Sequence, residues 1–170
     1  MPDRVWRTLK GEVVEDVLGE VLKATVGGQR IVHVGCDSQQ HGLHTDFVTV
    51  IALIKPGKGG RVFWTKERVP RFEVLRTRLL REVELSVNIA FKLSEILSED
   101  VELNVHVDVN PDIKYKSAKF MKELVGYVQG CGFKALTKPN SFVAMHVCDH
   151  IVKFKNNRDT RAHRGKKWNN

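Results

Sequence analysis

The sequence predicts an α/β fold in which a mixed five-stranded sheet is flanked by helices. Stretches with two-residue apolar alternation and stretches with helical apolar spacing follow one another in the order α-βββ-α-β-α-β-α. The chain has 170 residues, of which 42% are hydrophobic and 28% charged, as in an ordinary globular domain. No apolar run approaches the ~20 residues of a membrane span. One compact domain over residues 1–155 is therefore expected.

The first half of the chain predicts a helix and an antiparallel meander of three strands. Apolar residues at helical spacing indicate a helix over residues 9–25, ended by two glycines. Strands are predicted over residues 30–37, 45–55 and 61–69, with the turn-forming segment "KPGKGG" before the third. Strands this close in the chain favour antiparallel hairpin pairing.

The second half predicts parallel pairing. A long amphipathic helix is expected over residues 72–97, a fourth strand within 101–111, a helix over 116–132 and a fifth strand over 133–138. A last helix follows from residue 141. Strand–helix–strand units form right-handed parallel crossovers, so strands four and five should be parallel. The long helix likewise permits strand four to lie beside strand one.

The C-terminal end of the chain is strongly basic. The formal net charge is +8, and residues 156–170 are predicted to form a flexible basic tail. Such a segment is attracted to nucleic-acid phosphates, although a solvated tail that aids solubility is an equal alternative. The candidate nucleic-acid-binding residues are Lys153, Lys155, Arg158, Arg161, Arg164, Lys166 and Lys167.

Two strands share one polar pattern, a histidine followed two residues later by an aspartate. Asp37 ends this pattern in the first strand and Asp108 ends it in the fourth. If the two strands are parallel neighbours, both carboxylates emerge at the same sheet edge, where open α/β sheets bind ligands. Singly, each aspartate is better explained as a turn residue after a strand, and it is the order of the acids along the chain that favours a site.

Two helices contribute further acids. Asp149 lies on the apolar stripe of the last helix, which is costly unless the carboxylate is paired or binds a cation, and Lys153 at i+4 is one possible partner. On the long helix Glu84 and Glu82 border opposite edges of the apolar face, and periodicity does not choose between them. Carboxylate clusters suit Mg²⁺ or Mn²⁺, and two such ions support in-line phosphoryl displacement.

A few residues near these acids are auxiliary candidates. Ser38 follows Asp37 and is placed to touch a phosphate or to shape a turn, while His146 and His150 flank Asp149. The three cysteines, Cys36, Cys131 and Cys148, show no paired spacing, which favours reduced thiols, a cytoplasmic protein and no disulfide-linked partner.

With these motifs in order, the chain resembles the ribonuclease H-like superfamily. "VGCDSQQ", "VELSVNIAFKL", "HVDVNP" and "SFVAMHVCDHIVK" look like the segments that carry the acids of that fold. Within it, "GCDSQ", "EVELS", "KPNSFVA" and "DHIVK" are similar to a small bacterial family of the YkuK type. The resemblance covers residues 30–153 and the preceding helix.

The resemblance implies a metal-dependent nuclease that uses two Mg²⁺ or Mn²⁺ ions. On the matching positions, Asp37 and Asp108 would be central ligands, with Glu84 and Asp149 holding one ion each, and Glu84 would matter more than Glu82. The substrate would be DNA, RNA or a hybrid. The alternative is a module that keeps the fold and binds nucleic acid without cleaving it, and a scaffold protein is a third possibility.

Overall fold

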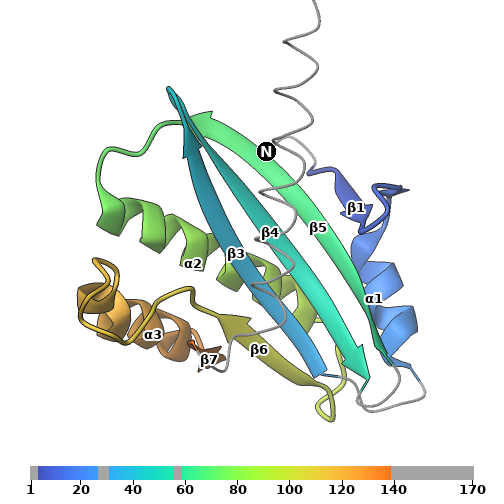
Figure 1. Cartoon of the computed structure of the whole chain (residues 1–170). Helices are drawn as coiled ribbons and strands as arrows, with labels where there is room; N and C mark the ends of the chain where they lie inside the picture. The colour runs from blue at the N-terminus through green and yellow to red at the C-terminus, as the bar shows by residue number, and fades with distance from the viewer. Residues whose placement is uncertain (1–3, 27–30, 56–58, 139–170) are drawn as a thin grey trace, which may run out of the picture.

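A single seven-stranded sheet organises the molecule. The computed structural model describes residues 4–26, 31–55 and 59–138 (Figure 1). Across the sheet the strand order is β2-β1-β5-β4-β3-β6-β7. The strands are β1 (Trp6–Thr8), β2 (Val13–Val14), β3 (Ile31–His41), β4 (His44–Lys55), β5 (Gly59–Pro70), β6 (Glu102–His106) and β7 (Lys134–Leu136). The helices are α1 (Val17–Thr25), α2 (Leu75–Ser94), a 3-10 turn η1 (Ala118–Phe120) and α3 (Met121–Gly130).

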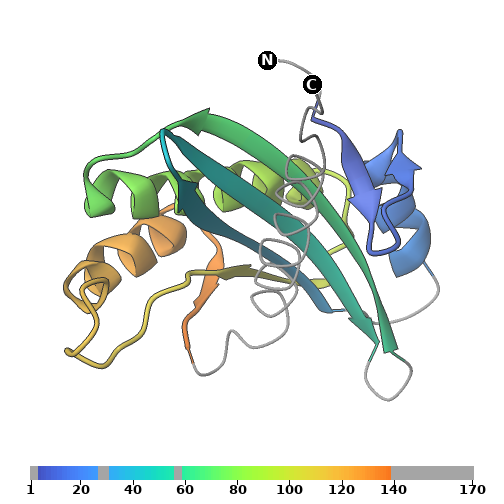
Figure 2. The same ribbon diagram turned by 45° about the horizontal axis from the view of Figure 1, so that its top comes forward.

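The predicted fold class and pairing are confirmed. Strands β3, β4 and β5 form the antiparallel meander, and β6 runs parallel to both β3 and β7. The long helix α2 makes the crossover between β5 and β6, so the fourth predicted strand does lie beside the first. In Figure 2 the three long strands β3–β5 cross over α2. Helix α1 (blue) lies on the right of this view and α3 (light orange) on the left.

The predicted helix over residues 9–25 is wrong in its first half, and this adds two strands to the predicted five. Strands β1 and β2 form a short hairpin whose turn includes Gly11 at a φ of 93°. Helix α1 begins only after Asp16, whose carboxylate accepts a hydrogen bond from the amide of Gly19. An N-cap aspartate satisfies an orphan amide at the first helical turn, which fixes the start of the helix there.

Strand β3 is longer than predicted, because β4 remains paired with it as far as His41. A two-residue turn then closes the hairpin, with Gly42 at a φ of 53°. The parallel partner β6 stops earlier, at the pair Gly35–His106. The pattern predicts that Asp37 ends its strand. In the structure β3 continues to His41, and Asp37 lies just past the end of the parallel ladder.

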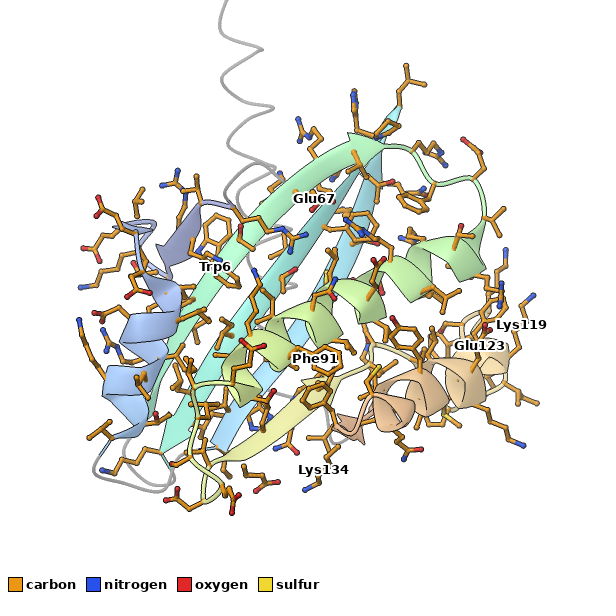
Figure 3. All side chains as sticks on the ribbon, turned by 180° about the vertical axis from the view of Figure 1, so that it is seen from behind. Trp6, Glu67, Phe91, Lys119, Glu123 and Lys134 are labelled. Carbon is orange, nitrogen blue, oxygen red and sulfur yellow. The ribbon has the colours of Figure 1, made fainter. Side chains whose placement is uncertain are left out.

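The described helices cover one face of the sheet. Figure 3 views the molecule from this side and shows α1, α2 and α3 in front of the strands. Val21 of α1 and Leu93 of α2 are fully buried against Val32 and Val34 of β3. Helix α3 contributes Leu124 and Val128 to a second cluster with α2 and β6; this cluster also holds Val83, Val87, Val105 and Val107. Helix α2 thus touches both clusters and is fixed over β3 and β6.

Two further expectations concern the cysteines and the membrane. Cys36 is buried, Cys131 is half-buried, and neither forms a disulfide; Cys148 lies outside the described residues. None of the helices in the described part of the chain is long and apolar enough to cross a bilayer.

A buried carboxylate on β4 links this strand to β5. The side chain of Asp46 is 1% exposed and forms ion pairs with Lys66 at 2.8 Å and Arg68 at 2.6 Å. Burial raises the pKa of Asp46, but hydrogen bonds and charge attraction from Arg68 and Lys66 outweigh it and lower the pKa to about 2.

The Asp46 site predicts acid-labile stability. Because its folded pKa lies below the ordinary 3.8, the stabilisation is present above that value and is lost as the pH falls toward 2. Asp46→Asn should lower the free energy of unfolding by about 2 kcal/mol at pH 7 and by much less near pH 2. Urea unfolding of both proteins at pH 7, 4 and 2.5 measures this. A constant difference across that range would contradict it.

Candidate functional site

Two aspartates follow the point where the parallel ladder of β3 and β6 ends. Gly35 and His106 are the last pair of the parallel ladder, and Asp37 and Asp108 each follow their member of that pair by two residues. Past β6 the contact with β7 continues for one residue, since the amide of Val107 donates to the carbonyl of Leu136, and the chain then turns, with the amide of Val109 donating to the carbonyl of Val107. Both aspartates thus lie just beyond the end of this ladder, and their convergence stays a prediction.

Glu82 is the helix acid beside this pair. It is 6% exposed, and the hydroxyl of Ser38 donates to its Oε1 at 2.5 Å. Burial raises the pKa of Glu82 well above its ordinary range, and the charges of Asp37 and then Asp108 raise it further. Glu82 and Asp108 also line one small pocket together with His106. Three carboxyl groups from β3, α2 and the end of β6 therefore lie within electrostatic reach of one another.

Arg78 supports Glu82 from the preceding turn of α2. Its Nη1 donates to the Ser38 hydroxyl at 3.2 Å and to the Ser38 carbonyl at 3.5 Å. The guanidinium charge also lowers the pKa of Glu82, in opposition to burial and to the two aspartates. Arg78 and Ser38 together fix where the Glu82 carboxyl sits relative to β3.

The two aspartates are held by different groups. The backbone amide of Ser38 donates to Asp37 Oδ1 at 2.8 Å. Asp108 Oδ1 lies 2.6 Å from Nζ of Lys138, which follows β7. An ammonium group thus lies beside Asp108, at the point where three carboxyl groups approach one another.

Glu84 does not join this cluster. Its carboxylate pairs with Arg81 at 3.0 Å, its side chain is 46% exposed, and the same arginine also binds Glu67 of β5 at 2.9 Å (Figure 3). Two residues along a helix correspond to about 200°, so Glu82 and Glu84 face nearly opposite directions. The expectation that Glu84 is the acid beside the aspartates is not met, and Glu82, the auxiliary candidate, takes that place.

The remaining candidates are outside the described residues. They are the fourth acid Asp149, the histidines His146 and His150, and the basic residues Lys153, Lys155, Arg158, Arg161, Arg164, Lys166 and Lys167. Ser38, in contrast, is placed at the centre of the cluster.

A histidine pair lies one step along the same strands. His106 Nε2 is 2.7 Å from His33 Nδ1, so the two rings share one hydrogen bond between β3 and β6. Burial lowers the pKa of His33, which favours the neutral ring. Two neutral histidines can share a hydrogen bond, whereas two imidazolium rings would repel. The polar positions of β3 and β6 thus form a second polar contact, between His33 and His106, which is partly buried and comes before the carboxylates along both strands.

The donor chemistry of the cluster fits a hard divalent cation. Carboxylate oxygens are the ligands that Mg²⁺ and Mn²⁺ prefer, and a cation would relieve the repulsion that raises the pKa of Glu82. Over residues 4–26, 31–55 and 59–138, however, no three His, Cys, Asp or Glu side chains form a ready-made metal site. Asp37, Glu82 and Asp108 would therefore have to draw closer, or gain another ligand, to hold an ion.

Two residues of the cluster escaped sequence reasoning. Arg78 lies four residues before Glu82, a spacing that places both on one helix face and was available as a signal. Lys138 follows the short strand β7 among ordinary loop residues, and nothing in the sequence near it points to Asp108. Its role depends on the β6–β7 register, which only the three-dimensional structure reveals.

The comparisons agree with the fold. Residues 12–153 match a family model described as "Ribonuclease H-like". A protein of Bacillus subtilis (strain 168) named "Uncharacterized protein YkuK" is 25% identical over 158 residues, which are 82% of this chain and 90% of that protein. No solved structure matches the chain significantly. The resemblance expected from the motifs is thus confirmed.

The raised pKa of Glu82 predicts a pH-dependent stability of the metal-free protein. The folded state favours protonated Glu82, so this contribution is complete below the ordinary pKa of 4.5 and is lost as the pH rises through the higher folded pKa. Glu82→Gln should flatten the fall in melting temperature between pH 4.5 and pH 8 in EDTA. Glu84→Gln is the control, and it should leave the wild-type slope. Identical slopes for wild type and Glu82→Gln would contradict the assignment.

Proposed function

Because the chain belongs to the ribonuclease H-like family, we propose that it is a divalent-metal-dependent nuclease that hydrolyses nucleic-acid phosphodiester bonds. The observation that carries the proposal is the approach of Asp37, Glu82 and Asp108 at the end of the parallel ladder. Acids from three separate elements share one small region, and burial alone gives no reason to gather them there.

Each group of the cluster has a proposed role. Asp37 and Asp108 would be the central ligands of Mg²⁺ or Mn²⁺, and Glu82 would be a third ligand in place of Glu84. Two such ions, when bound, supply charge neutralisation and water activation for in-line displacement at phosphorus. Asp149 stays a proposed fourth ligand, as the resemblance implied.

The chain itself prepares Glu82 for that role. The hydroxyl of Ser38 and the guanidinium of Arg78 hold the Glu82 carboxyl in one position, which reduces the entropy lost on ligand binding. Its raised pKa favours a bound proton on the Glu82 carboxyl in the metal-free state. That proton must leave when a cation binds, so metal affinity should rise with pH. The ion pair between Lys138 and Asp108 must likewise break before Asp108 can bind a cation.

The second candidate function is a nucleic-acid-binding module without cleavage. The ion pair of Lys138 with Asp108 favours it, because an ammonium group supplies positive charge beside the acids without a metal. The net charge of +8 supports phosphate binding in either case. A cleavage assay separates the two candidates, since only the first requires a divalent cation.

Substitutions of the acids test the nuclease proposal. Asp37→Asn and Glu82→Gln should each lower the rate of Mn²⁺-dependent cleavage by about a hundredfold or more, because each removes a charged ligand. Glu84→Gln removes one exposed pair and should change the rate by about twofold at most. The assay uses labelled single strands, duplexes, hybrids and junctions of DNA and RNA, with Mg²⁺, Mn²⁺ or EDTA.

The controls separate chemistry from folding and binding. Circular dichroism verifies that each variant is folded, and binding in EDTA verifies that it still holds the polymer. Salt-sensitive binding without any metal-dependent cleavage would favour the binding module. A larger loss for Glu84→Gln than for Glu82→Gln would overturn the choice between these two acids.

A further inference from the structure

The loop between β6 and η1 presents an unusual set of side chains to solvent. Residues 111–116 are all exposed, and Ile113 and Tyr115 are 93% and 54% exposed. Lysines alternate with them, since Lys114 and Lys116 flank the tyrosine. Within residues 110–122 there are four lysines and one aspartate. Residues 111–119, which include the first two residues of η1, are called the lysine–tyrosine loop below.

The loop is held in shape by its own backbone contacts. The side chain of Asn110 accepts from the amide of Asp112, and the side chain of Asp112 accepts from the amide of Lys114. The amide of Tyr115 donates to the carbonyl of Asp112 at 3.0 Å. These turns use Asn110 and Asp112, and Lys114 adds an exposed ion pair with Asp112 at 3.9 Å, whereas no such contact within the described part of the chain employs the side chains of Ile113, Tyr115 and Lys116. Their exposure calls for another explanation.

The loop starts at the proposed nuclease site. Tyr115 follows Asp108 by seven residues, so it lies within about 25 Å of that carboxylate. At the far end of the loop, Lys119 projects away from the sheet beside the start of α3 (Figure 3), with its Nζ 4.9 Å from the ring centroid of Phe120. A bound strand that reaches the carboxylates can therefore also touch the loop.

We propose that the lysine–tyrosine loop binds single-stranded nucleic acid, with Tyr115 stacking on an unpaired base and Lys114 and Lys116 contacting the adjacent phosphates. This inference rests on the proposed function and narrows its substrate to strands with unpaired bases next to the cleavage site. Exposed aromatic side chains offer a stacking platform to any base, and lysines follow the backbone without reading sequence. A duplex keeps its bases stacked on one another, so it offers Tyr115 no base face.

A protein partner fits the loop less well. Interface cores are depleted in lysine, because burial of an ammonium group is costly. In this loop each apolar side chain has a lysine beside it, and Lys116 and Lys119 form no ion pair with the other residues that the structure describes. Alternation of charge and ring is the pattern of a surface that meets phosphates and bases together.

The first experiment measures binding of the full chain in EDTA, where no cleavage occurs. The probes are fluorescein-labelled 15-mers of dT and of U and a 15-base-pair duplex, read by fluorescence anisotropy. Tyr115→Ala should raise the Kd for both single strands about fivefold or more, and Tyr115→Phe should restore it because the ring remains. Tyr127→Ala is the matched control, since Tyr127 is 43% exposed on α3 and lies outside the loop.

The second experiment measures the salt dependence of the same binding. The double variant Lys114→Ala/Lys116→Ala should reduce the slope of log K against log salt by about 1.4, since each phosphate contact on a single strand contributes about 0.7. Lys10→Ala/Lys92→Ala removes two exposed lysines elsewhere and should leave the slope unchanged. The basic residues from Lys153 onward are present in every variant, so their contribution cancels.

The outcomes distinguish this inference from the nuclease proposal. Unchanged binding by Tyr115→Ala, an equal loss for the duplex, or no binding of the labelled strands at all would overturn the inference. Cleavage that is lost in Asp37→Asn but unchanged in the loop variants would support the nuclease proposal and contradict the role of the loop. Binding that depends on the loop, without any metal-dependent cleavage, would support the role of the loop and contradict the nuclease proposal. Melting temperatures within a degree of wild type confirm that the variants fold.

Discussion

The alignment of β3 with β6 is the constraint on which the candidate site depends. The pair Gly35–His106 ends the parallel ladder two residues before both Asp37 and Asp108, and a shift of one residue would change which residues follow the end of the ladder on each strand. Helix α2 fixes this alignment, because Val83 and Val87 pack against Val105 and Val107 in one cluster. The same packing carries Glu82 to Ser38. The hydrophobic core thus determines where the charges meet.

Glu82 shows how a core helix can hold a charged group. Its neighbours Val83 and Leu85 are nearly fully buried, so the helix backbone has no freedom to move the carboxyl into water. Ser38 and Arg78 offset part of the cost, whereas the two aspartates add to it. Gathering these carboxyl groups lowers the stability of the folded protein, and a bound ligand would offset that cost, as is common at functional sites.

Much of the fold could be predicted from the sequence, because alternation in the strands and periodicity in α2 are strong signals. The N-terminal hairpin was missed because Val13 and Val14 fit the helical spacing of the following residues, and two-residue strands carry no period of their own. The two aspartates were found because the same pattern occurs on both strands. Periodicity leaves Glu82 and Glu84 open because both border the apolar stripe, and the resemblance to the family assigns Glu84. The packing of α2 over Ser38 instead places Glu82 in the cluster.

The site unites segments that are far apart in the chain. Gly35 and His106 are 71 positions apart, whereas β3, β4 and β5 follow one another through short turns. During synthesis the meander can form as soon as residue 70 is available, but the partner of Asp37 arrives only after the crossover helix is complete. A partly made chain therefore holds one half of the acid pair, and the cluster of Asp37, Glu82 and Asp108 can assemble only when the domain is nearly complete.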